Sequence, residues 1–276
     1  MVDVMKATKP WQEGNVDLCG LNIHYYRTGN ADKSALVVAH GFGDNGLCWR
    51  RVANDLQHHF DVIMIDARNH GQSGTAPANS TAIIDDLASV IIALNLDKPA
   101  LLGHSMGAST VAGVAAQYPH LISKIILEDP LWEERTRAES AEDQNKRLHA
   151  YQQQLEAQQA LSDKEIIQAG IVQHPTWRAD EFPDWAIAKQ QVRAEAMLGL
   201  SVSNWTQTHD LVSRITCPSL LIRAETGSDG VITAKIATKV VESNNHFSAV
   251  DVAGAGHNIR REGFDEYLAI VSTFLE

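Results

Sequence analysis

The sequence has little cysteine and none of the common metal or phosphate-binding patterns. Its three cysteines, Cys19, Cys48 and Cys217, are widely spaced in a chain of 276 residues. An odd number at such spacings suits neither a disulfide framework nor a zinc site, so a cytoplasmic location is expected. H-E-x-x-H, C-x-x-C and G-x-x-x-x-G-K-[ST] patterns are absent from the sequence. No metal or organic cofactor is therefore expected.

Positive charge is also scarce. The chain has 23 Lys and Arg residues against 34 Asp and Glu, a formal net charge of -11. Nucleic acids and anionic membranes recruit proteins through basic patches, so neither is an expected partner. No apolar run approaches the roughly 20 residues of a membrane span, and residues 1–11 lack the apolar centre of a signal peptide. We expect a monomer or homodimer that acts on a small molecule.

Short apolar runs alternate with helical patterns along most of the chain. Continuous apolar strands separated by helices are typical of a parallel sheet covered on both faces. Two further runs, 16–19 and 21–27, meet at Gly20 and predict an antiparallel hairpin. The expected buried strands are 35–39, 62–65, 100–102, 124–127, 219–224 and 247–252, and the expected helices include 49–58, 81–94, 234–242 and 264–275.

This alternation stops between residues 133 and 213, where no strand pattern is clear. Residues 133–160 are rich in Gln and Glu, with a sparse apolar stripe of Leu148, Tyr151 and Leu155. A helix this polar cannot lie deep in a core. We therefore predict a helical cap, residues 132–213, inserted into an α/β core made of residues 1–131 and 214–276. Trp177, Trp185 and Trp205 either line a pocket or pack within this cap.

The most informative local motif is Gly103-His104-Ser105-Met106-Gly107, which reads G-x-S-x-G between a strand and a helix pattern. A serine at such a junction sits on a sharp turn, and glycines on either side relieve the crowding. The turn also puts the hydroxyl near a helix N-terminus, where N–H groups stabilise an anion. Ser105 is thus a candidate nucleophile, although the same motif also occurs by chance in ordinary loops.

A serine hydroxyl needs a base within hydrogen-bond reach, and the base needs an orienting acid. His257 follows the last predicted strand, at the edge of the sheet where active sites of open α/β folds gather. Two acids compete for the third position: Asp129 directly ends one strand, and Asp229 follows the next. Asp129 is preferred and Asp229 is the alternative. The expected oxyanion donors are the backbone N–H groups of Met106 and Phe42.

His40-Gly41, the motif around Ser105 and Gly256-His257 occur in the order found in the α/β-hydrolase superfamily, which this chain resembles. The resemblance implies an α/β-hydrolase fold with a mostly parallel, twisted sheet of about eight strands, flanking helices and a variable cap. It also implies a serine hydrolase acting on a small carboxylic ester or lactone through an acyl-enzyme. In the superfamily the acid usually follows the later of these two strands, at the place that Gly227 occupies in this chain. The resemblance therefore favours Asp129 over Asp229. Hydrolysis of a C–C bond in a diketone is an alternative on the same triad.

Two other classes of function remain open. Residues 41–46 fit the G-x-G-x-x-G pattern of dinucleotide-binding folds, and Asp66 lies where a ribose-binding acid would fall. An NAD-dependent oxidoreductase would leave Ser105 and His257 unexplained, so this alternative ranks lower, and a non-catalytic ligand receptor is also compatible. Asp66 and its neighbours are expected to tie down a loop instead. Trp132 is a candidate substrate-binding residue at the mouth of the site.

Overall fold

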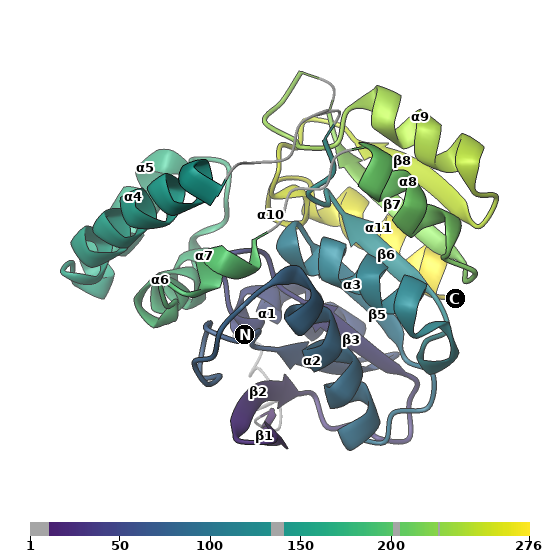
Figure 1. Ribbon diagram of the computed structural model, residues 1–276, viewed down its shortest axis with the longest axis horizontal. Helices are drawn as coiled ribbons and strands as arrows, with labels where there is room; N and C mark the ends of the chain where they lie inside the picture. The colour runs from purple at the N-terminus through teal and green to yellow at the C-terminus, as the bar shows by residue number, and fades with distance from the viewer. Residues whose placement is uncertain (1–10, 134–140, 201–204, 226) are drawn as a thin grey trace, which may run out of the picture.

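An open sheet of eight strands forms the centre of the computed structural model, which describes residues 11–133, 141–200, 205–225 and 227–276 (Figure 1). Its strand order is β1-β2-β4-β3-β5-β6-β7-β8. The pairs β1–β2 and β2–β4 are antiparallel, and the strands from β4 to β8 run parallel. The sheet confirms the predicted fold class. The strands are β1 (Gln12–Leu18), β2 (Leu21–Arg27), β3 (Ala35–Ala39), β4 (Asp61–Ile65), β5 (Ala100–His104), β6 (Ile125–Glu128), β7 (Ser219–Ala224) and β8 (Phe247–Val252).

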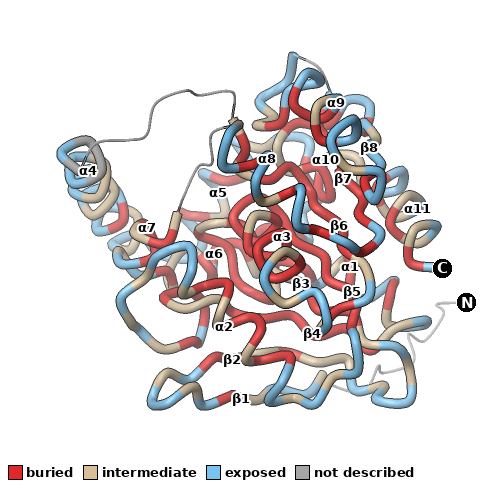
Figure 2. Tube along the Cα trace, turned by 45° about the vertical axis from the view of Figure 1, so that its right-hand side comes forward, coloured by how far each residue is buried: buried red, intermediate tan, exposed pale blue. Residues whose placement is uncertain are grey.

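Helices cover both faces of this sheet. One face carries α1 (Arg50–Leu56), α10 (Ile259–Glu262) and α11 (Phe264–Leu275), preceded by the 3-10 turn η1 (Gly46–Trp49). The other face carries α2 (Ser80–Ala93), α3 (Met106–Gln117), α8 (Trp205–Ser213) and α9 (Ala234–Ser243), and the 3-10 turn η2 (Pro119–Leu121) follows α3. Two helical layers therefore enclose the central strands, which are buried along their length (Figure 2).

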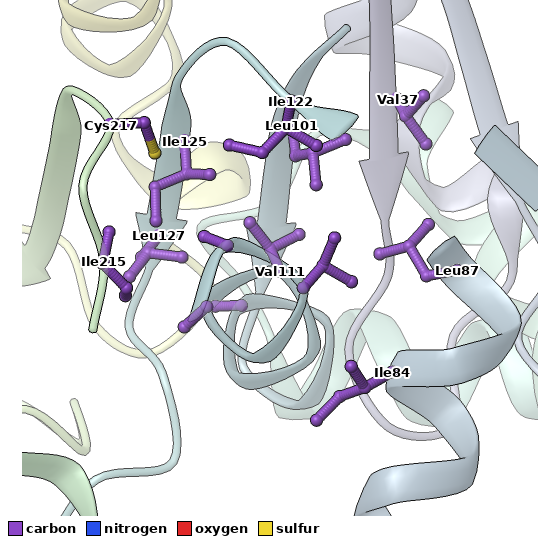
Figure 3. Close-up of a cluster of buried hydrophobic side chains, with 14 of the residues drawn as sticks. Val37, Ile84, Leu87, Leu101, Val111, Ile122, Ile125, Leu127, Ile215 and Cys217 are labelled. Atoms are coloured by element: carbon purple, nitrogen blue, oxygen red, sulfur yellow. The ribbon is translucent and has the colours of Figure 1, made fainter. Parts of the chain in front are cut away.

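The two faces are packed by alternate side chains of the same strands, because successive residues of a strand point in opposite directions. Leu101 and Leu127 lie in the cluster that also contains Val111 of α3 (Figure 3). Leu102 and Ile126 belong to the cluster on the opposite face. Each fully buried aliphatic side chain stabilises the fold by about 1.5–3 kcal/mol. The continuous apolar runs of the sequence are thus explained by burial on both sides.

The predicted boundaries differ from the structure mainly at the first hairpin. β1 runs from Gln12 to Leu18 rather than over 16–19, pairing with β2 from Gln12–Arg27 to Leu18–Leu21. A backbone ladder does not need apolar side chains, so the polar start of β1 gave no sequence signal. The second helix begins at Ser80, where Asn79 accepts a 2.9 Å hydrogen bond from Ala82 N–H.

The segment between β6 and β7 supplies helices that project beyond the sheet (Figure 1). They are α4 (Ala141–Gln159), α5 (Asp163–Gln173), the 3-10 turn η3 (Ala179–Glu181), α6 (Phe182–Gln191) and α7 (Ala196–Gly199), followed by α8. Between 133 and 213, the described residues include no strand. Trp177, Trp185 and Phe182 are buried together, at ring-centroid distances of 5.8–6.3 Å. Trp177 also contacts Arg261 and Glu262 of α10, so these tryptophans pack where the helical segment meets the core. The Trp205 side chain lies outside what the structure describes. None of the described helices is both long and apolar enough to cross a membrane.

Candidate active site

Ser105 occupies a sharp turn between β5 and α3, with φ 54° and ψ −114°. A Cβ atom on Gly103 would lie 2.4 Å from the Gly107 carbonyl oxygen, and one on Gly107 would lie 2.2 Å from that of Ala39. Both distances are shorter than any real Cβ contact. The two glycines are therefore required by the close approach of backbone. Left-handed backbone on a non-glycine residue costs about 1–3 kcal/mol and persists only where the surroundings impose it.

The structure brings Ser105, His257 and Asp129 together. His257 Nε2 lies 3.1 Å from Ser105 Oγ, and His257 Nδ1 lies 2.6 Å from Asp129 Oδ2. Asp129 is fully buried, and its carboxylate also accepts 2.8 Å hydrogen bonds from the N–H groups of Val231 and Ile232. These two donors fix the carboxylate so that one oxygen faces the imidazole. The geometry is that of a nucleophile, a base and an orienting acid.

Asp229, the alternative acid, contacts the backbone of His257 and not its ring. Its Oδ1 atom accepts a 2.9 Å hydrogen bond from His257 N–H. His104 Nε2 lies 2.9 Å from the His257 carbonyl oxygen, so both backbone polar groups of His257 are engaged. His257 is therefore held in place through its backbone as well as through Asp129.

The charge of the His257 ring is set by opposing effects. Burial disfavours the imidazolium of His257, but the hydrogen bond and charge of Asp129 outweigh burial, and the pKa of His257 is raised. A histidine can accept a serine proton only when its ring is neutral. Asp129 thus increases the basicity of His257 and also increases the fraction of molecules in which this ring is already protonated.

We predict that kcat/KM for a neutral substrate rises with pH through a group whose pKa lies above the ordinary 6.5 of histidine. In Asp129→Asn the ascending limb should move to lower pH, because the charge that raises the pKa of His257 is gone. Profiles of kcat/KM between about pH 5 and 9, recorded for the wild type and for Asp129→Asn, measure the ascending limb of each protein. A limb at the same pH in the variant would contradict the assignment of Asp129 as the partner of His257.

The loop after β3 lies against Ser105. A Cβ atom on Gly41 would lie 3.5 Å from Ser105 Cβ. Among the described residues, no hydrogen-bond partner is found for the N–H groups of Phe42 and Met106. Met106 is the first residue of α3, a position whose N–H has no partner within the helix. Both N–H groups can therefore serve as oxyanion donors, and this role stays a prediction.

A buried cluster of charges lies behind this loop, centred on Asp44. Its carboxylate accepts hydrogen bonds from Arg260 (2.9 Å) and Arg261 (3.1 Å), and Lys189 Nζ lies 3.6 Å away. Burial raises the pKa of a carboxyl group, but these cations outweigh burial and hold the pKa of Asp44 well below its usual range. Arg260 N–H also donates to Glu128, the neighbour of Asp129, at 2.9 Å. The cluster joins the loop after β3, the end of β6 and the helix after His257.

Sequence reasoning missed the cations of this cluster. Arg260 and Arg261 follow His257 within four residues and Asp44 follows Phe42 by two. The closeness of these charged residues to His257 and Phe42 in the sequence was the signal that could have indicated the cluster. Lys189 comes from α6, far away in sequence, and nothing local marks it.

Trp132 and Asp66, the remaining candidate residues, are not part of the Ser105–His257–Asp129 arrangement. Trp132 is 1% exposed and lines a cavity of about 270 Å³ beside α3, together with Leu131 and Met106. Its role in substrate binding stays a prediction.

Asp66 is fully buried and accepts hydrogen bonds from the N–H groups of Gly46 (2.7 Å) and Gln72 (2.9 Å). These bonds tie down its loop, so the carboxylate is not free for a ribose hydroxyl. Among the described residues, no group of His, Cys, Asp and Glu is arranged to hold a metal.

A family model described as the alpha/beta hydrolase fold matches residues 34–259. The chain therefore belongs to the α/β-hydrolase fold family. The match covers the sheet from β3 onward and every residue of the Ser105–His257–Asp129 arrangement.

Proteins similar in sequence are named for different hydrolase activities. N-formylmaleamate deformylase of Pseudomonas putida is 36% identical over 120 residues, 42% of this chain and 44% of that protein. A putative esterase/lipase of Haemophilus influenzae is 25% identical over 254 residues, 87% of this chain and 82% of that protein. The match to the first relative thus spans less than half of its length. Both names indicate hydrolysis, the reaction class that the comparisons support.

The fold has solved counterparts. The structure of E-2-(acetamidomethylene)succinate hydrolase superposes with a TM-score of 0.78, covering 96% of this chain and 99% of that one, at 20% sequence identity. At this level of identity the likeness concerns the fold alone.

Proposed function

We propose that the protein is a serine hydrolase that cleaves a small carboxylic ester or lactone through an acyl-enzyme. One observation carries the proposal: Ser105 Oγ, the His257 ring and the Asp129 carboxylate form a continuous chain with separations of 3.1 and 2.6 Å. A serine on a strained turn, aimed at a base that is oriented by a buried carboxylate, is the arrangement that activates a hydroxyl for acyl transfer.

The reaction follows from this geometry. Ser105 Oγ attacks the substrate carbonyl carbon while His257 Nε2 takes its proton, and the carbonyl oxygen becomes an oxyanion near the N–H groups of Phe42 and Met106. The C–O bond to the leaving alcohol then breaks, and His257 returns the proton to that alcohol. Water attacks the resulting acyl ester of Ser105, again with His257 as base, and releases the acid. Each oxyanion donor contributes about 10²- to 10³-fold to such a rate.

The name of the Haemophilus influenzae relative supports ester cleavage, and that of the Pseudomonas putida relative supports removal of a formyl group. Both reactions replace a bond at a carbonyl carbon by one to water, so the same three side chains serve either. Which bond is cleaved depends on the side chains that contact the substrate. The helical segment reaches the loop after β3, where Tyr151 of α4 lies 5.1 Å from the Phe42 ring, so we expect this segment to contribute to the choice.

A substrate panel tests the proposal. We expect turnover of short p-nitrophenyl esters or of lactones, and slower or no turnover of an N-formyl amide and of a C–C diketone. A fluorophosphonate probe should add its mass to the peptide that contains Ser105. Faster cleavage of the diketone than of every ester would shift the assignment to C–C hydrolysis. Absence of both turnover and labelling would overturn the proposed reaction, and tight NAD binding in its place would favour an oxidoreductase.

A further inference from the structure

One cation of the buried cluster comes from the helical segment and reaches the loop that holds a candidate oxyanion donor. Lys189, on α6, donates a 2.8 Å hydrogen bond from Nζ to the carbonyl oxygen of Gly43. The same atom lies 3.6 Å from Asp44 Oδ1 and 5.1 Å from the centre of the Trp185 ring. The lysine side chain is 16% exposed, so its ammonium group is committed to these partners rather than to bulk water.

The loop at this point is a tight turn. Asp44 N–H donates to the Gly41 carbonyl at 3.1 Å, and Gly43, the third residue of the turn, has φ +74°. A positive φ at this place is the type II arrangement, which glycine permits. Phe42, the candidate donor, is the second residue of the same turn. The direction of its N–H therefore depends on how the Gly41–Asp44 turn is held.

Two sets of contacts hold this turn from outside. Arg260 and Arg261 anchor the side chain of Asp44, and Lys189 anchors the backbone at Gly43. Once a turn is hydrogen-bonded at one end and fixed at a central carbonyl, its peptide planes have little freedom to rotate. An oxyanion donor must be pre-organised, because a donor that has to reorient during the reaction stabilises the transition state less.

We propose that Lys189 is a positioning residue that orients the Phe42 N–H toward the substrate carbonyl by holding the Gly43 carbonyl. The inference rests on the proposed serine hydrolase reaction. Lys189 does not touch the reacting atoms, and it acts through the turn. In this way α6 contributes to the oxyanion site through the Gly41–Asp44 turn.

A second contact between α6 and the rest of the chain provides a matched control. Arg50 Nε donates to Asp184 Oδ2 at 2.5 Å and Arg50 Nη2 donates to Asp184 Oδ1 at 3.1 Å. This ion pair also docks α6 on the core, but it touches neither Gly43 nor Asp44. Asp184→Asn therefore weakens the docking of α6 without releasing the turn.

The test compares Lys189→Met with Asp184→Asn. Methionine keeps the apolar stem against Trp185 but cannot donate to Gly43. We expect kcat of Lys189→Met to fall about 10- to 100-fold, less than the loss of a whole oxyanion donor, with KM within about threefold of the wild type. Hydrogen–deuterium exchange of a peptide that covers residues 41–46 should be faster in Lys189→Met than in the wild type. Asp184→Asn should match the wild type in both measurements.

Failure of this inference can be told apart from failure of the proposed reaction. Unchanged exchange and unchanged kcat in Lys189→Met would overturn the positioning role. Equal losses in both variants would also overturn it, because they would assign the effect to docking of α6 in general. If the wild type neither turns over esters nor reacts with the fluorophosphonate, the proposed reaction is wrong. The exchange measurement then still decides whether Lys189 holds the turn.

Discussion

Ser105→Ala should reduce kcat on the best ester of the panel by about 10⁴- to 10⁶-fold. The substitution removes the proposed nucleophilic atom and keeps the backbone of the sharp turn at Ser105, so His257, Asp129 and the proposed oxyanion donors remain. Residual turnover would come from water activated by His257 next to those donors. KM should change little, because the hydroxyl forms no bond with the acyl group before attack.

The measurement combines kinetics with covalent labelling. Fluorophosphonate should label the wild type and fail to label Ser105→Ala. Ser109 provides a matched control, because it lies one helical turn further along α3 and its Oγ accepts a hydrogen bond from Leu131 N–H. Ser109→Ala should lose about 1 kcal/mol of stability and stay fully labelled. Labelling that persists in Ser105→Ala, or turnover within tenfold of the wild type, would show that another residue is the nucleophile.

The parts of the fold and site that could be predicted from the sequence depend on local patterns. Apolar runs of strand length give the parallel sheet because both faces of each central strand are buried. The spacing of Gly103, Ser105 and Gly107 predicts the sharp turn between β5 and α3, because backbone approaches both glycines too closely for any Cβ atom. His257 could be found because the ends of parallel strands meet at one edge of the sheet.

The contacts that could not be predicted are those between residues far apart in sequence. Lys189 meets Gly43 across 146 residues, and no local pattern of α6 marks the lysine that makes this contact. Asp129 and Asp229 both follow a strand of the parallel sheet, and what distinguishes them is the direction of their side chains. At Asp129 the backbone turns to φ 45° and the carboxylate reaches the imidazole, whereas the carboxylate of Asp229 reaches the backbone N–H of His257.

The same substitution at these two aspartates should therefore have very different effects. Asp129→Asn should lower kcat by about 10⁴-fold, because an amide that donates to His257 Nδ1 holds the imidazole in the tautomer that cannot accept the proton of Ser105. Asp229→Asn keeps an oxygen that accepts from His257 N–H and removes only a nearby charge that helps to raise the pKa of His257. Its kcat should stay within about tenfold of the wild type, with the ascending limb of the pH profile moved slightly to lower pH.

Thermal unfolding of the two variants separates catalysis from folding. The single amide oxygen in Asp129→Asn can accept from only one of the N–H groups of Val231 and Ile232, so this variant should lose about 1–3 kcal/mol of stability while the protein still folds. A loss of kcat in Asp229→Asn as large as that in Asp129→Asn would mean that the charge of Asp229 acts on the imidazole itself. Loss in Asp229→Asn alone would make Asp229 the acid and leave Asp129 the task of joining β6 to the turn at Val231. Because both variants exchange one carboxylate for one amide, the comparison isolates the position of the charge, which is what the geometry around His257 assigns to Asp129.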